Sequence, residues 1–169
     1  MPARILVFCK KSVDHVTAKM VTEELKLADL CTLAETLDLP EGEEAAVDAM
    51  WEQFQIASEG GSLNGAELHW HASQRPVQVR VGPPVAGELE ETMELLPKNK
   101  GGKRVRSHLE QTRFVVEFEM GIDGSNHLAA TISEVTAFLF AEQGDGLVWF
   151  FHREFAAPDD RGATLCVTR

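Results

Sequence analysis

The chain of 169 residues carries 27 acidic and 16 basic residues, which gives a formal net charge of −11 at pH 7. Its hydrophobic content of 44% and charged content of 25% are typical of a globular protein and exclude extensive disorder, and a chain of this length buries enough surface to fold without a metal or a disulfide. Because an acidic surface repels phosphate backbones and anionic lipid, we expect neither nucleic acid nor a membrane as partner, whereas a basic protein is compatible.

The cysteines and the N-terminal residues favour a cytoplasmic protein. Three cysteines, none of them in a Cys-x-x-Cys pair, suit a reducing compartment better than a disulfide framework. The apolar run at residues 5–9 is too short for the core of a signal peptide and for a membrane span.

The first elements are a strand and two helices. Residues 4–9 are continuously apolar, which predicts a strand that is buried on both faces. A helix with two apolar stripes follows, for which Ser12 or Asp14 is the expected N-cap. Pro40 and the acidic residues after it predict the start of a second helix, whose apolar face ends at Phe54.

From Ala66 the apolar period changes to two. Residues 66–71 and 77–81 alternate apolar and polar side chains across a turn, which predicts a hairpin with one solvated face. Residues 88–96 then predict a short helix, and residues 98–104 have no apolar periodicity and predict an exposed loop.

The C-terminal part repeats the change from strand to helix to strand. Residues 114–120 predict a strand, residues 126–143 a helix capped by Gly144, and residues 147–151 and 164–167 the closing strands. The whole pattern predicts an α+β fold of about six mostly antiparallel strands with helices packed on one face.

Both halves of the chain show the order strand, helix, strand, strand. We expect one domain over residues 1–169, in which residues 1–97 and 105–169 form two similar lobes joined by the basic loop 98–104. No repeat of individual residues accompanies this topological similarity.

The alternating segment contains a candidate metal site. Leu68 and Trp70 are expected to be buried, while Glu67, His69 and His71 project from the opposite face. Two imidazoles and a carboxylate are competent ligands for zinc or another first-row divalent metal, although a solvated hairpin face explains them equally well. Further ligands could come from the remaining histidines of the C-terminal half, which are His108, His127 and His152.

The predicted basic loop is a candidate anion site. Its basic residues are Lys98, Lys100, Lys103 and Arg104, and the paired glycines between them could turn backbone amides toward an anion. It lacks the glycine and Ser/Thr pattern of a Walker A loop. The alternative is a solvated loop that opposes the acidic residues just before it.

The aromatic run near the C-terminus is a candidate protein-binding site. Trp149, Phe150 and Phe151 are consecutive, so at least one ring points away from the core. With Val148 and Phe150 on the core side, Trp149 and Phe151 lie opposite, covered either by the helix at residues 47–54 or by a second molecule.

No motif in the chain names a reaction, since it lacks Gly-x-Ser-x-Gly, Gly-x-Gly-x-x-Gly and His-Glu-x-x-His. We therefore expect a non-enzymatic protein that binds another protein or itself, like bacterial immunity or antitoxin-like factors, adaptors and regulatory subunits. This hypothesis requires no cofactor. The alternative is a metal-dependent hydrolase that uses Glu67, His69 and His71.

Overall fold

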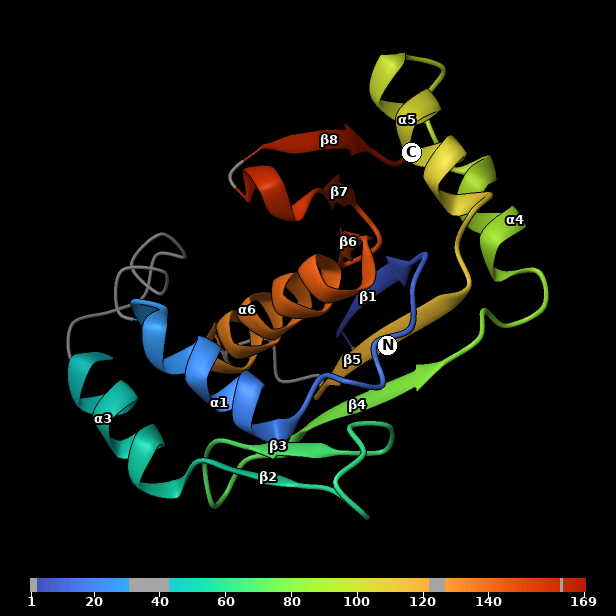
Figure 1. Ribbon diagram of the computed structural model, residues 1–169. Helices are drawn as coiled ribbons and strands as arrows, with labels where there is room; N and C mark the ends of the chain where they lie inside the picture. The colour runs from blue at the N-terminus through green and yellow to red at the C-terminus, as the bar shows by residue number, and fades with distance from the viewer. Residues whose placement is uncertain (1–2, 31–42, 122–126, 162) are drawn as a thin grey trace.

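The computed structural model describes residues 3–30, 43–121, 127–161 and 163–169, and it has an α+β fold (Figure 1). One antiparallel sheet of eight strands runs in the order β2-β3-β4-β5-β1-β6-β7-β8. The strands are β1 (Ala3–Cys9), β2 (Gln55–Ala57), β3 (Glu67–His69), β4 (Val77–Gly82), β5 (Phe114–Met120), β6 (Gly146–Phe150), β7 (Glu154–Ala156) and β8 (Thr164–Val167).

The described helices lie between these strands. They are α1 (Ala18–Leu27), α3 (Glu43–Gln53), α4 (Glu88–Glu94), α5 (Lys100–Leu109), α6 (His127–Gly144) and the short 3-10 helix η1 (Pro158–Asp160). No helix of the described ranges is long and apolar enough to cross a membrane.

Strand β1 is the centre of the sheet. It pairs with β5 over its whole length, from Ala3 opposite Met120 to Cys9 opposite Phe114, and with β6 on its other side. Residues 5–9 are all buried, as the continuous apolar run predicts. Because β5 and β6 follow residue 105 and β1 begins the chain, one continuous sheet joins the two parts of the sequence.

Helices cover both faces of this sheet. On one face α6 and α1 lie side by side, and Phe140 of α6 and Leu25 of α1 belong to the larger core cluster (Figure 1). On the other face Val105 and Leu109 of α5 pack with Phe8 in a second cluster. We expected helices on one face of the sheet only. Helix α5 covers the other face as well, because the side chains of β1 are apolar on both of its sides.

The strands at residues 4–9, 77–81, 114–120, 147–151 and 164–167 are confirmed, with small differences at their ends. Strands β2 and β7 were not predicted, because three residues are too few to show a period of two. The predicted number of about six is therefore too low for the described sheet.

The predicted cap of the first helix was wrong. The side chain of Thr17 caps α1 and accepts a hydrogen bond from the backbone N of Met20 at 3.2 Å. Ser12 and Asp14 precede the helix. The predicted helical residues 31–37, the helix start at Pro40 and the first helical residue 126 lie outside the described ranges.

Candidate binding site along helix α5

A cleft of about 780 Å³ opens where the end of β1 meets three other segments. These segments are α5, the end of α6 with the start of β6, and η1. The lining side chains are predominantly polar and of both charges: Lys10, Lys11, Arg104, Ser107, His108, Gln111, Glu142, Asp145 and Asp159.

His108 anchors α5 to the central strand beside this cleft. It is buried, and its Nε2 lies 2.8 Å from the carbonyl oxygen of Phe8. Burial lowers the pKa of His108, although the hydrogen bond to Phe8 opposes that change. A neutral ring that donates from Nε2 leaves Nδ1 as the acceptor. His108 therefore contributes a neutral polar wall to the cleft, 100 residues away in sequence from its partner.

Next to the residues that line the cleft, the end of α6 packs closely against the end of β1. A Cβ atom on Gly144 would lie 2.6 Å from the Sγ of Cys9. Burial, assisted by the charge of Asp145, raises the pKa of the Cys9 thiol to about 12. The backbone N–H of Lys11 donates to the carbonyl oxygen of Gly144 at 2.9 Å. Cys9 is therefore a buried thiol that is protonated at neutral pH.

The prediction of an exposed loop at residues 98–104 was wrong. Asn99 caps α5, and its Oδ1 accepts a hydrogen bond from the backbone N of Gly102 at 2.8 Å. Helix α5 then runs through both glycines. They are required by close packing: a Cβ on Gly101 would lie 1.9 Å from the carbonyl oxygen of Leu165, and one on Gly102 equally close to that of Pro97. Glycines needed for close approach and glycines of a flexible loop look alike in a sequence.

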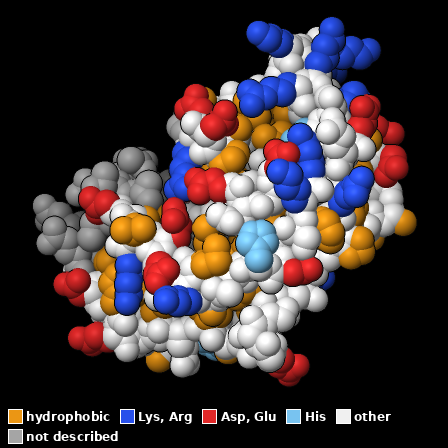
Figure 2. All heavy atoms as spheres, viewed as in Figure 1, with side chains coloured by type: hydrophobic (Ala, Val, Ile, Leu, Met, Phe, Trp, Pro, Cys, Tyr) orange, Lys and Arg blue, Asp and Glu red, His pale blue; other side chains and the backbone are white. Residues whose placement is uncertain are grey.

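Five exposed basic residues lie in α5 or just before it. We call the five of them the α5 basic cluster: Lys98, Lys100, Lys103, Arg104 and Arg106. Figure 2 shows Lys and Arg side chains gathered at the upper right of the molecule, where Figure 1 places α5. None of the five forms an ion pair with a carboxylate of the described residues. The acidic residues of α4 therefore do not neutralise them by contact, although Arg106 donates to the carbonyl oxygen of Met93 at 2.7 Å.

The candidate metal ligands are only partly brought together. Leu68 and Trp70 are buried, as predicted. His69 Nε2 lies 3.1 Å from Glu67 Oε2, but His71 follows the strand, and its Nδ1 lies 3.2 Å from the backbone N of Ser73. The described part of the chain contains no group of three His, Cys, Asp or Glu side chains that could hold a metal ion. The geometry therefore lends the metal hypothesis no support.

The candidate protein-binding aromatics are separated by the structure. Trp149 is buried within the second core cluster, where it stacks on Phe155 with a centroid distance of 5.3 Å and contacts Phe8. Of the two alternatives for its cover, the helix at residues 47–54 is wrong, because Val47 and Met50 of that helix belong to the larger core cluster, whereas Trp149 belongs to the second. Phe151 is 44% exposed. Trp149 is therefore a core residue, and Phe151 alone of the pair remains at the surface.

Comparisons of the chain with protein-family models, curated proteins and solved structures gave no match.

Proposed function

We propose that this protein acts by binding an acidic segment of another protein along α5 and into the adjoining cleft, without catalysing a reaction. The observation that supports the proposal is the α5 basic cluster, which has five exposed cations and no ion pair with a described carboxylate. Like charges on neighbouring turns of a helix repel one another, so an anionic partner would stabilise this surface.

The cleft extends this surface away from the helix. Arg104 belongs to both, and Lys10 and Lys11 line the cleft from the end of β1. Lys10 lies 3.9 Å from Asp145, whereas Lys11 and Arg104 form no ion pair with a described residue. A bound segment could therefore place one carboxylate on the helix and another at the cleft.

A short acidic peptide fits this surface better than a nucleic acid. Helix α5 has 10 residues, which corresponds to a length of about 15 Å. A duplex is longer than this cluster and would bring its phosphates toward the rest of a chain whose net charge is −11. A few carboxylates on a flexible segment would reach the cations without that repulsion.

The experiment measures binding of a labelled decaglutamate peptide by fluorescence anisotropy at low ionic strength. We expect saturable binding that weakens as salt is added. The triple variant Lys100→Glu/Lys103→Glu/Arg104→Glu should bind at least about 10-fold more weakly, since exposed ion pairs contribute about 0.2–1 kcal/mol each and reversal adds repulsion.

The control is a variant with the same change in net charge at other exposed cations, Lys19→Glu/Lys26→Glu/Arg75→Glu. If it binds the peptide as weakly as the α5 variant, overall charge explains the binding and the site is wrong. Absence of binding at low salt contradicts the proposal. Tighter binding of a 20-base-pair duplex than of decaglutamate would replace the protein partner by a nucleic acid.

A further inference from the structure

Helices α4 and α5 lie next to each other and carry opposite charges. Glu90, Glu91 and Glu94 of α4 are exposed, and the α5 basic cluster begins four residues after Glu94. The side chain of Arg106 donates to the carbonyl oxygen of Met93 and so joins the two helices. Figure 2 shows acidic side chains at the right edge of the molecule, just below the basic ones, where Figure 1 places α4. The surface of this helix pair is therefore acidic on one side and basic on the other.

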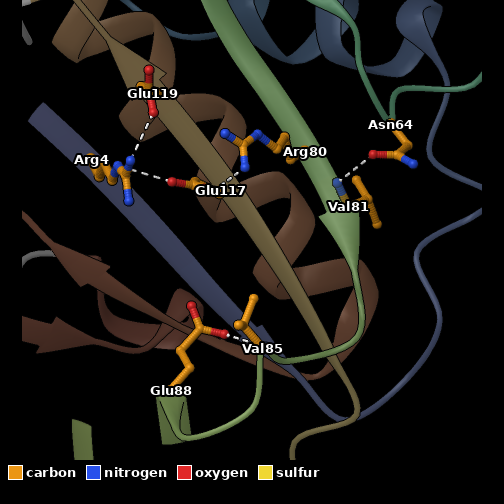
Figure 3. A network of polar contacts seen from close by, with 8 residues as sticks. All are labelled: Arg4, Asn64, Arg80, Val81, Val85, Glu88, Glu117 and Glu119. Atoms are coloured by element: carbon orange, nitrogen blue, oxygen red, sulfur yellow. Dashed lines mark hydrogen bonds and ion pairs between the residues drawn. The ribbon is translucent and has the colours of Figure 1, made fainter. Parts of the chain in front are cut away.

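These charges are not neutralised by contacts within the chain. Among the described residues, no ion pair includes a side chain of α4 or of the α5 basic cluster. The sheet beside α4 differs, because Arg4 forms ion pairs with Glu117 and Glu119 (Figure 3). Glu88, at the start of α4, accepts a hydrogen bond from the backbone N of Val85 at 3.0 Å (Figure 3). The carboxylates that remain for an external partner are those of the exposed side of α4.

Two exposed apolar side chains flank these carboxylates. Val85, before α4, is 72% exposed, and Leu95, directly after it, is 36% exposed. Both line a pocket of about 400 Å³ together with Glu91. A molecule that contacts the exposed side of α4 would therefore cover apolar surface as well as charge, which adds to the attraction.

A surface that carries both charges side by side is complementary to itself. A second copy that is rotated by half a turn about an axis between the two charged sides places its α4 over α5 of the first copy and its α5 over α4. Each contact of such an interface is made twice. The net charge of −11 opposes association. At about 0.1 M salt, however, charges more than about 10 Å apart are largely screened, whereas charges in contact are screened less.

We propose that α4 of a second copy of this chain occupies the α5 basic cluster in a two-fold symmetric dimer, and that an acidic partner competes with this dimer for the same cations. The inference rests on the proposed function, because both take the α5 basic cluster as a site for an acidic segment. The dimer regulates that site: it covers the cations until an acidic segment of another protein displaces the second copy.

Sedimentation equilibrium at about 0.1 M salt measures the dimer. We expect the wild type to dimerise with a dissociation constant on the order of 10 μM, as suits a small interface. The α5 variant Lys100→Glu/Lys103→Glu/Arg104→Glu should dimerise at least about 10-fold more weakly, because its α5 then opposes the acidic α4 of the second copy.

The α4 variant Glu90→Lys/Glu91→Lys/Glu94→Lys reverses the other side of the interface. Alone it should also dimerise at least about 10-fold more weakly, since its basic α4 meets the basic α5 of its own kind. Mixed in equal amounts with the α5 variant, it should form a dimer within about 3-fold of the wild-type constant, because acidic and basic helices then face each other again. Neither variant dimerises well alone, so a dimer in the mixture contains one copy of each.

Two control variants carry the same changes in net charge at exposed residues away from the interface. Lys19→Glu/Lys26→Glu/Arg75→Glu matches the α5 variant. Asp48→Lys/Glu52→Lys/Glu59→Lys matches the α4 variant. Both controls should dimerise within about 3-fold of the wild type, since screening weakens charges far from the contact. If either control is as weak as its matched variant, net charge explains the association and the assigned surface is wrong.

Competition with decaglutamate separates this proposal from the proposed function. Decaglutamate should dissociate the wild-type dimer. A wild type that is monomeric at about 100 μM, roughly ten times the expected constant, overturns the dimer; if that monomer binds decaglutamate, the proposed function stands, and if it does not, both fail. A dimer that decaglutamate leaves intact, or a mixture of the two variants that stays monomeric, also overturns the proposal. If circular dichroism shows that the α4 variant is unfolded, the α5 variant and the competition decide.

Discussion

Gly101 of α5 lies against the backbone of β8, so that a Cβ atom on this residue would be 1.9 Å from the carbonyl oxygen of Leu165. Because of this close contact, the first turn of α5 packs directly on β8, the edge strand of the sheet. The contact also explains why a segment with two adjacent glycines is helical: the packing that they allow offsets their low helix propensity.

Gly101→Ala should therefore destabilise the protein. An exposed helix position would gain about 1 kcal/mol from this change, but here the overlap with Leu165 should lower the free energy of unfolding by about 2 kcal/mol or more. Urea denaturation measures the difference. Lys103→Ala, at an exposed position of the same helix, should change stability by less than about 0.5 kcal/mol. A more stable Gly101→Ala would contradict the docking of α5 on β8.

Trp149 and Phe151 should differ sharply in their contribution to stability. Trp149→Ala removes a buried ring that contacts Phe8 and Phe155, and it should cost about 3–5 kcal/mol. Phe151→Ala should cost less than about 1 kcal/mol, because the side chain is 44% exposed. Thermal or chemical denaturation of the two variants tests this. Similar losses in both would place the two rings in equivalent surroundings, against the structure.

His108 should make stability decrease at mildly acidic pH. Burial holds its pKa in the folded protein below the ordinary value of 6.5. Well above pH 6.5 the ring is neutral in both states, and its contribution to stability is complete. As the pH falls through 6.5 toward the folded pKa, the unfolded chain binds a proton that the folded protein does not, so the free energy of unfolding falls.

Chemical denaturation between pH 7.5 and 5 measures this dependence, with His108→Gln as the comparison. Gln can donate to the carbonyl oxygen of Phe8 and does not titrate. Carboxyl groups titrate near the same range, and burial raises the pKa of Glu134, so the informative quantity is the difference between the two proteins. If the free energy of unfolding changes equally with pH in the wild type and in His108→Gln, His108 is not held neutral by burial.

A substitution at Phe151, in the turn between β6 and β7, should stabilise the protein. Phe151 and His152 have φ values of 48° and 59°, and the backbone N of Arg153 donates to the carbonyl oxygen of Phe150 at 2.8 Å. Two positive φ angles in such a turn favour Asn followed by Gly. Phe151→Asn should therefore raise the free energy of unfolding by about 0.5–1 kcal/mol, as measured by urea denaturation. A loss of more than about 1 kcal/mol would show that the Phe151 ring makes contacts that matter more than the backbone strain.

The sequence by itself determined the central strands. The continuous apolar run at residues 4–9 and the alternation at residues 114–120 are local patterns, and at that length both favour a strand over a helix. The burial of Leu68 and Trp70 and the helix that ends at Gly144 could be predicted for the same reason.

Only the tertiary structure decided which of these residues share a surface. The helical state of residues 100–104 depends on the distance from Gly101 to Leu165, and the cover of Trp149 comes from Phe8 and Phe155. The polar atoms of Arg4 and Glu117, 113 positions apart in sequence, meet because β1 and β5 are neighbours in the sheet. Local periodicity specifies which way a side chain points along its own strand or helix, but its neighbours across the sheet depend on the pairing order of segments far apart in the chain.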